Sequence, residues 1–174
     1  MSVRPILVFG DARLEAPNSQ VENFDSALET LVDDLFETGW QAPGLGLAAP
    51  QIGVNLRLVT VDLSVGKDPA KKIVLANPTI TETSGRISLE EGCLSFPGLF
   101  TTISRPRELV VRAQNLYGET LEIEASGLLA QAICHEVDHL DGRLLVHHLH
   151  GIKKRMFLRR VAKMRKTGVW QATT

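Results

Sequence analysis

Apolar side chains recur at helical spacing near the start of the chain, across residues 23–38. Five of them fall on one stripe: Phe24, Leu28, Leu31, Leu35 and Phe36. A stripe of this kind is typical of a helix that buries one face against a core. Because Gly39 follows, and glycine commonly ends helices, the pattern predicts an amphipathic helix over residues 23–38.

Four short segments farther along the chain have the β-branched or alternating character of strands: residues 56–62, 73–77, 109–114 and 119–124. Turn residues punctuate this part of the chain: Gly66, Pro69, Pro78 and the Tyr117-Gly118 pair. A second helical pattern begins after Gly127. Strand groups around one buried helix predict an α+β fold. Since no repeat, low-complexity segment or linker interrupts the chain, we expect a single domain over residues 1–174.

The last part of the chain, about residues 147–166, combines bases with apolar residues at helical spacing. The apolar residues are Leu149, Ile152, Met156, Val161 and Met164. This pattern predicts an amphipathic C-terminal helix that docks on the domain with one face. The tail after Asp141 holds nine Lys or Arg and no acid, whereas residues 1–142 carry 10 bases and 20 acids. Such a basic face is usually a solubilising surface, but the asymmetry also permits an anionic partner.

Composition and cysteine content narrow the class of protein. With 174 residues, 44% of them hydrophobic, the chain is long enough to bury a core. Two cysteines do not make a secretory disulfide framework, and neither end carries an apolar run as long as a signal peptide or membrane span. We therefore expect a cytoplasmic protein with no membrane association and with free thiols. A Cys93–Cys134 disulfide is the competing alternative.

The stretch with the clearest chemistry is His135-Glu136-Val137-Asp138-His139. Residues four apart in a helix lie side by side on consecutive turns, so His135 and His139 make half of a metal site. Glu136 projects from a neighbouring direction, where a carboxylate is suited to take a proton from a water held by the metal. The alternative is a solvated polar helix face whose histidines do nothing.

A catalytic site of this type needs three protein ligands and one open position. Cys93, within Glu91-Gly92-Cys93-Leu94-Ser95, supplies a thiolate. Metalloproteases with this helix motif draw the third ligand from a downstream residue, but here that position holds Leu145, and no acid follows Asp141. Three further histidines remain as candidates: His147, His148 and His150. We predict that these lie in a solvated turn, and we rank Cys93 above them.

A third conspicuous segment, residues 44–51, is Gly-Leu-Gly-Leu-Ala-Ala-Pro-Gln. Its small residues suit a backbone that something approaches closely. It lacks the Lys-Ser/Thr pair of a phosphate loop, and Ala49 stands where a dinucleotide fingerprint needs its third glycine. Taken alone, the segment favours a plain tight turn that leads into the strand at residues 56–62, and only its combination with the other two segments reverses that preference.

The predicted metal helix also indicates where a substrate lies. Leu128, Gln131 and Ala132 share the face of His135 through helical spacing. We therefore predict a pocket with apolar walls beside the metal. Core packing is the alternative role for Leu128 and Ala132.

Residues 44–51, 91–95 and 135–142, taken in that order, resemble the three motifs of the peptide deformylase family. The resemblance extends to Phe9-Gly10-Asp11-Ala12-Arg13-Leu14 and to Ser104-Arg105-Pro106, and so covers nearly the whole chain. One departure is visible, because the family usually has Gln where this chain has Cys134. Cys134 lies about 100° round the helix from His135, and we interpret it as a buried packing thiol.

The resemblance implies antiparallel sheets that surround a central metal-binding helix. It also implies hydrolysis of the N-formyl group from a formyl-methionyl nascent peptide, with formate as a product. In this scheme Glu136 takes and returns the proton. The side-chain amide of Gln51 and the backbone N–H of Leu94 donate to the oxyanion.

The same resemblance assigns the substrate side of the site. The peptide backbone is expected to pair along Leu45 and Gly46 by strand addition. Glu91 is expected beside the substrate, and the pocket on the metal helix is expected to take the methionine side chain.

Cofactor and partners follow from the same resemblance. One thiolate and two imidazoles suit several divalent ions. The family suggests Fe²⁺ in the cell, with Zn²⁺, Ni²⁺ or Co²⁺ able to substitute. Since the substrate emerges from the ribosome, ribosomal RNA is the anionic partner expected for the tail, and we expect no DNA binding. Two other classes stay open: a metal-dependent peptidase, and a non-catalytic binding module with a structural metal.

Overall fold

The computed structural model describes residues 2–168 and residue 170. Within these residues there are three α-helices: α1 (Ser26–Gln41), α2 (Gly127–Leu140) and α3 (Gly151–Lys166). The same residues form seven strands: β1 (Gly46–Ala48), β2 (Leu58–Val61), β3 (Ile73–Ser84), β4 (Ile87–Gly92), β5 (Phe100–Arg105), β6 (Glu108–Gln114) and β7 (Thr120–Ser126). None of these helices has the length and apolar character needed to cross a membrane.

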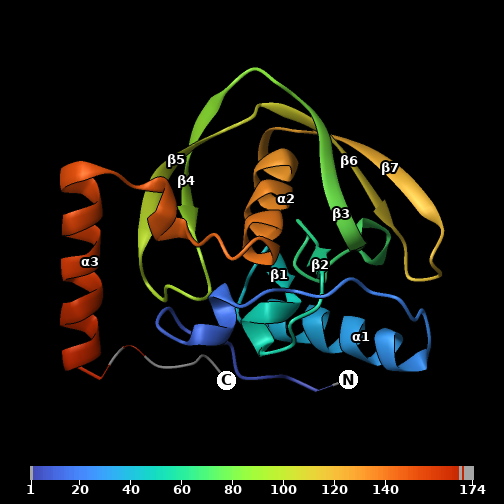
Figure 1. Ribbon diagram of the computed structural model, residues 1–174, viewed down its shortest axis with the longest axis horizontal. Helices are drawn as coiled ribbons and strands as arrows, with labels where there is room; N and C mark the ends of the chain where they lie inside the picture. The colour runs from blue at the N-terminus through green and yellow to red at the C-terminus, as the bar shows by residue number, and fades with distance from the viewer. Residues whose placement is uncertain (1, 169, 171–174) are drawn as a thin grey trace.

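Helix α2 lies at the centre of the molecule, with strands on several sides of it (Figure 1). Five strands form an antiparallel sheet in the order β1-β2-β3-β6-β7, and β4 pairs with β5 in a separate antiparallel sheet. Helix α1 lies along the lower edge in this view, below β1 and β2. The predicted α+β fold, with antiparallel sheets around one central helix, is confirmed.

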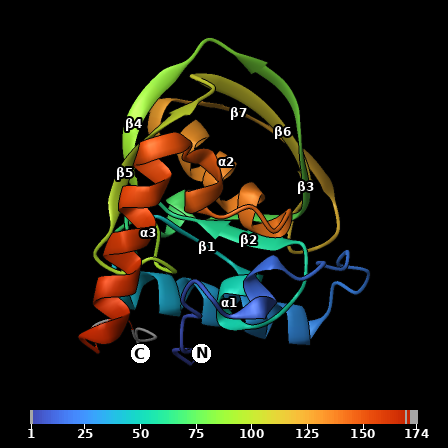
Figure 2. The same ribbon diagram turned by 60° about the vertical axis from the view of Figure 1, so that its left-hand side comes forward.

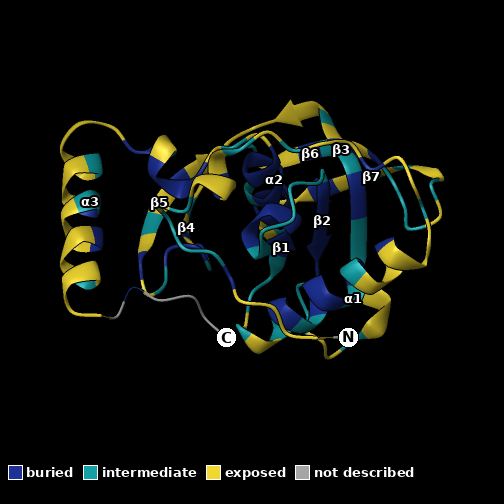
Figure 3. Cartoon of the chain, turned by 60° about the horizontal axis from the view of Figure 1, so that its bottom comes forward, coloured by how far each residue is buried: buried dark blue, intermediate teal, exposed yellow. Residues whose placement is uncertain are grey.

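The burial of α2 explains why this helix can hold a site away from bulk water. Ala130, Ile133 and Val137 of α2 belong to one buried apolar cluster, which also contains Val59 and Val111 of the large sheet. Figure 3 shows most of α2 in the colour of buried residues, from Ala130 onward with the exception of His135. Burial of this apolar face stabilises the helix in a fixed position, and the polar residues on its other face are held in place with it.

Helix α1 begins and ends about three residues later than predicted. It begins after Asp25, whose side chain accepts hydrogen bonds from the backbone N–H groups of Ala27 and Leu28. Gly39 does not end the helix: it is buried within α1, and a Cβ at this position would meet Leu47 of β1 at an ordinary 3.8 Å. The prediction of an amphipathic helix was right, and its end at residue 38 was wrong.

The strand predicted at residues 73–77 is longer than expected, because β3 continues to Ser84. Asn77 has a positive φ of 53°, and the register with β6 shifts between Ala76 and Thr79. The Asn77 side chain donates to the backbone carbonyl of Val21 and accepts from its N–H, which holds this irregular segment. A bulge therefore carries the strand past Pro78. Strands β1, β4 and β5 were not predicted.

Helix α3 packs beside β4 and β5 at one side of the molecule, as Figures 1 and 2 show from two directions. It is shorter than the predicted 147–166, because residues Leu145–His148 form a separate 3-10 turn. The predicted docking face was partly wrong, since Ile152 and Met156 are 64% and 59% exposed. Phe157, absent from the predicted stripe, is buried, and its ring packs 5.5 Å from that of Phe96.

Candidate metal centre

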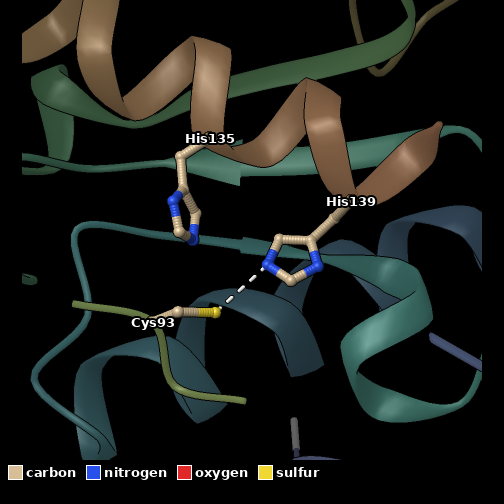
Figure 4. A group of neighbouring side chains, drawn as sticks. All are labelled: Cys93, His135 and His139. Atoms are coloured by element: carbon tan, nitrogen blue, oxygen red, sulfur yellow. Dashed lines mark hydrogen bonds between the residues drawn. The ribbon is translucent and has the colours of Figure 1, made fainter. Parts of the chain in front are cut away.

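His135 and His139 lie one turn apart on α2, and both rings point toward Cys93 (Figure 4). Cys93 directly follows strand β4, so the ligands come from two elements far apart in sequence. The Nε2 atom of His139 lies 3.3 Å from the Cys93 sulfur. One potential ligand atom from each of the three residues lies within 4.8 Å of the others. The structure thus brings together the three residues that the sequence predicted as ligands.

This donor set fits a divalent metal ion. One sulfur and two imidazole nitrogens make three ligands, and a catalytic site keeps its fourth position open. Among the described residues, no other group of three or more His, Cys, Asp or Glu side chains is placed to hold a metal. His147 accepts a hydrogen bond from Leu144 N through Nδ1, and His148 Nε2 pairs with Asp138, so neither joins the site.

The electrostatics of the cluster favour a thiolate at Cys93. Burial alone would raise the pKa of this thiol, but the charges of His139 and His135 outweigh burial and lower the pKa from 9.0 to about 5. Burial also opposes charge on His135, yet the neighbouring Cys93 thiolate raises the pKa of His135 well above its ordinary value. Both shifts come from opposite charges held together in a buried place, as a thiolate ligand requires.

Cys134 is buried in the apolar cluster around α2 and makes no disulfide. Burial raises the pKa of its thiol from 9.0 to about 11. It is not among the residues placed to hold a metal. Its predicted role as a packing thiol is confirmed by this environment, and the alternative Cys93–Cys134 disulfide is excluded.

Glu136 directly follows the first histidine on α2 and lines a cavity together with Cys93 and His135. Its side chain is only 4% exposed, and its Oε2 atom has no hydrogen-bond partner within the described part of the chain. Burial raises the pKa of its carboxyl group from 4.5 to about 6, because it outweighs the opposing charges of His135 and His139. A carboxylate with a pKa near 6 and a free oxygen can both take and return a proton at neutral pH.

The side chain of Glu91 holds His135 in place. Glu91 Oε2 lies 3.1 Å from Nδ1 of His135, and Arg105 donates to both carboxylate oxygens of Glu91 at 2.8 and 3.0 Å. Arg105 also donates to Asp138. Burial opposes ionisation of Glu91, but hydrogen bonds from His135 and Arg105 prevail and lower its pKa to about 2.

This arrangement gives the Glu91 side chain a role that the sequence did not predict. Both of its carboxylate oxygens are engaged by protein groups, so its side chain orients a ligand ring. The predicted contact of Glu91 with a substrate stays a prediction. Sequence reasoning assigned no role to Arg105 or to Asp138. For Arg105, its position in the Ser104-Arg105-Pro106 segment was the sole indication.

A cavity of about 580 Å³ is lined by two of the three ligands, Cys93 and His135. Its walls include every residue predicted to face the substrate: Leu45, Gly46, Glu91, Leu128, Gln131 and Ala132. Gln51, Leu94, His135 and Glu136 line the same cavity. A volume of this size suits a small ligand or a few residues of a peptide.

Comparison with known proteins identifies the family. A family model described as "Polypeptide deformylase" matches residues 3–155. The chain belongs to this family. Peptide deformylases remove the N-formyl group from nascent peptides, so the cavity beside Cys93, His135 and His139 is the candidate active site of a hydrolase.

Individual deformylases are similar to this chain in sequence and structure along nearly its whole length. The peptide deformylase of Acidobacterium capsulatum is 45% identical over 170 residues, which cover 98% of this chain and 100% of that protein. A crystal structure of a peptide deformylase from Legionella pneumophila has a TM-score of 0.90 at 41% identity, covering 97% of this chain and 98% of that one. The deformylase of Ehrlichia chaffeensis in complex with actinonin has a TM-score of 0.85 at 36% identity, covering 94% and 98%.

In this deformylase, Gln51 is held with its amide nitrogen toward the thiolate ligand. Its Oε1 atom accepts from the backbone N–H of Ala48 at 2.9 Å. Its Nε2 atom donates to Ser95 Oγ at 3.2 Å and to the Cys93 sulfur at 3.8 Å. Ser95, which the sequence analysis quoted without a role, therefore helps to fix the orientation of the amide.

Strand β1 is an edge strand of the deformylase sheet, and it borders the cavity. Leu45 O accepts from Asp62 N on the β2 side. Because hydrogen bonds alternate along an antiparallel strand, the N–H and C=O of Gly46 point away from β2. A Cβ added to Gly46 would lie 2.8 Å from Glu136 Oε1, so this position has room for backbone alone.

Proposed function

We propose that Glu136, Gln51 and Leu94 carry out deformylation of formyl-methionyl nascent peptides at a metal held by Cys93, His135 and His139. The observation that carries this proposal is the free carboxylate oxygen of Glu136, a residue that lines the same cavity as Cys93 and His135. The carboxylate does not belong to the ligand set, so it is available for proton transfer. We also propose that residues 1–174 form one catalytic domain.

We propose Fe²⁺ as the ion in the cell, with Zn²⁺, Ni²⁺ or Co²⁺ able to take its place. A thiolate and two imidazoles accept all four ions, so the donor set supports a divalent metal without selecting one. When bound, such an ion lowers the pKa of the attacking water and polarises the formyl oxygen. Glu91 and Arg105 keep the His135 ring oriented toward the ion.

Glu136 moves the proton in this scheme. As a carboxylate it takes a proton from the attacking water, and as a carboxylic acid it returns that proton to the leaving amine. Its pKa of about 6 lies close enough to neutrality for both directions. The products are formate and a peptide with a free α-amine.

Gln51 and Leu94 stabilise the charge that grows on the formyl oxygen. The Gln51 amide cannot turn away, because Ala48 N and Ser95 Oγ hold it from two sides. Leu94, directly after Cys93, offers its backbone N–H at the same wall of the cavity. One such donor typically contributes about 3–4 kcal/mol of transition-state stabilisation.

The peptide binds as an added strand along β1. The N–H and C=O of Gly46 pair with the peptide backbone, and Leu45 contributes to the same wall. The methionine side chain then enters the part of the cavity lined by Leu128, Gln131 and Ala132. Main-chain pairing is insensitive to sequence, so residues after the methionine are tolerated broadly.

The test of the catalytic proposal is Glu136→Gln, which keeps the size of the side chain and removes the base. We expect metal content to stay at the wild-type level and formate release at neutral pH to fall by about 10²–10⁴-fold. Glu122→Gln, an exposed change of the same kind on β7, is the matched control and should keep full activity. Substantial formate release by Glu136→Gln would assign the proton to another group.

The two other classes of protein that the sequence left open would give different results in the same assay. A metal-dependent peptidase would cleave an unformylated peptide internally. A binding module with a structural metal would show full metal occupancy and no turnover by the wild-type protein. Neither outcome is expected, because the three ligands leave a position open beside Glu136.

We further propose a cytoplasmic location, with α3 as a contact to ribosomal RNA. Its exposed face combines bases with the exposed Ile152 and Met156. Contacts to phosphates release counterions, so binding should weaken steeply as salt increases. Co-sedimentation with ribosomes across a salt series tests this expectation, and absent or salt-insensitive binding would contradict it.

The variants for this test change equal numbers of bases on and off the helix. The first replaces five residues of α3 by Gln: Lys153, Lys154, Arg159, Arg160 and Lys163. The matched control replaces five exposed bases elsewhere by Gln: Lys67, Lys71, Arg86, Arg107 and Arg112. Only the first should lose ribosome binding, and both should deformylate a free formyl-methionyl peptide at the wild-type rate.

A further inference from the structure

Gln131 is a polar residue in the part of the cavity that we assign to the substrate's first side chain. It lies one turn before His135 on α2 and lines the cavity together with Leu128 and Ala132. Its side chain is 4% exposed. Its amide nitrogen is enclosed and has no hydrogen-bond partner within residues 2–168 and 170.

An enclosed amide without a partner is unfavourable. A buried donor left unsatisfied typically costs about 1–3 kcal/mol, whereas a Leu or Met at the same position would carry no such cost. The cavity borders this side chain, so whatever enters the cavity can supply the missing partner once the amide turns about its last side-chain torsion. The structure therefore contains a donor that a bound side chain can satisfy.

We infer that Gln131 makes this pocket select a linear first side chain that carries a hydrogen-bond acceptor, namely the thioether of methionine and also its sulfoxide. The inference rests on the proposed placement of the methionine side chain in this part of the cavity. The Gln131 amide donates to the sulfur of methionine, which is a weak acceptor, or to the sulfoxide oxygen, which is a strong one. Norleucine has the same length but a methylene in place of sulfur, so it leaves the amide without a partner.

The alternative is a pocket that selects by shape and apolar contact alone. Such a pocket would accept norleucine as well as methionine, and it would reject the sulfoxide, whose oxygen would be buried without a partner. Sites that hydrogen-bond a substrate group discriminate strongly against analogues that lack it. The order of preference among these three side chains therefore distinguishes the two kinds of pocket.

The experiment compares three formyl-peptides that differ only in the first residue: methionine, norleucine or methionine sulfoxide. We measure kcat/KM of metal-loaded wild-type protein and of Gln131→Met, which keeps the length of the side chain and removes the amide. Wild type should process the sulfoxide within about tenfold of methionine and should disfavour norleucine by about tenfold. In Gln131→Met, norleucine should match methionine, and the sulfoxide should fall at least tenfold further behind methionine.

Gln41→Met is the matched control, because Gln41 is exposed at the end of α1 and does not line the cavity. It should leave all three rates unchanged. Equal effects of Gln131→Met on the three peptides would overturn the inference, as would a wild-type protein that rejects the sulfoxide.

A second measurement separates this inference from the proposed function. The three formyl-peptides are titrated by calorimetry into metal-loaded Glu136→Gln and into the double variant Glu136→Gln/Gln131→Met. The first should bind methionine and its sulfoxide more tightly than norleucine, and the second should lose that order. If wild type releases no formate but the order of binding holds, the proposed function fails and the inference stands. Loss of the order in the first protein overturns the inference whatever the turnover.

Discussion

Gly46→Ala tests whether catalysis depends on the close contact between Gly46 of strand β1 and the side chain of Glu136. A Cβ at this position would lie 2.8 Å from Glu136 Oε1, 2.9 Å from its Cγ and 3.1 Å from its Cδ. Rotation of the carboxylate alone does not relieve this overlap, because Cγ is as close as the terminal oxygen. Either the whole Glu136 side chain or strand β1 must therefore move.

The size of the displacement follows from these distances. Carbon atoms pack best at about 3.5–4.0 Å, so the contact to Cγ is about 0.6 Å too short. Glu136 is buried on α2, and β1 is hydrogen-bonded to β2, so neither can retreat freely. A misplacement approaching 1 Å at a reacting group typically costs about 10²-fold in rate, or about 2.7 kcal/mol of barrier.

The assay is formate release from a formyl-methionyl peptide by the metal-loaded variant, with kcat and KM determined separately. We expect kcat to fall by about 10²-fold while the metal content stays at the wild-type level, since Glu136 is not a ligand. Gly39→Ala is the matched control. Its new Cβ would meet Leu47 at an ordinary 3.8 Å, and alanine in a helix stabilises by up to about 1 kcal/mol relative to glycine.

A double-mutant cycle shows whether the loss passes through Glu136. In a Glu136→Ala background the side chain ends at Cβ, so Cγ, Cδ and Oε1 are gone and the added methyl group of Gly46→Ala has none of them to displace. The second substitution should then cost clearly less than in wild type. Wild-type kcat in Gly46→Ala, or full additivity in the cycle, would refute the contact as the cause.

Three further predictions concern the thiols and the C-terminal helix. Cys93→Ser should lose metal and activity together, while Cys134→Ala keeps wild-type metal stoichiometry by elemental analysis; equal metal loss in both would contradict the ligand assignment. In metal-free protein at pH 7, iodoacetamide should modify Cys93, whose pKa of about 5 leaves it as thiolate, and spare Cys134, whose pKa of about 11 keeps it protonated. Mass spectrometry reads the site, and added metal should protect Cys93. Phe157→Ala should lower the free energy of unfolding by about 3–5 kcal/mol in urea titrations, against less than about 0.5 kcal/mol for the exposed Met156→Ala; similar losses would mean that α3 is not docked through Phe157.

The sequence by itself predicted the parts of the site that depend on local geometry. His135 and His139 are four residues apart, and the helix places such residues on one side whatever surrounds it. Leu128, Gln131 and Ala132 line the cavity for the same reason. The third ligand, Cys93, was predicted because a catalytic site needs three protein ligands and because of the order of the motifs. No local spacing relates Cys93 to the helix.

The tertiary structure determined which charged side chains contact one another. Arg105 contacts Glu91 across 14 positions of the chain and Asp138 across 33, so no periodic pattern in the sequence could indicate this network. The carboxylate of Glu91, a residue that the sequence predicted only to lie beside the substrate, contacts His135 and Arg105. A buried charge takes the orientation in which its partners satisfy it, and those partners are brought by distant segments.

The same distinction holds for the elements. The apolar stripe of α1 was sufficient to predict that helix but not its last turn: the helix continues past Gly39 to Gln41, and the N–H of Ala42 donates to Thr38 O. Helix α3 has apolar residues on more than one side, and contact with Phe96 selects the side of Phe157 over that of Met156. Periodicity along the chain therefore determined that these helices form and which pairs of residues share a face. Long-range packing determined which face of α3 is buried, because that choice depends on the surface that the rest of the chain presents.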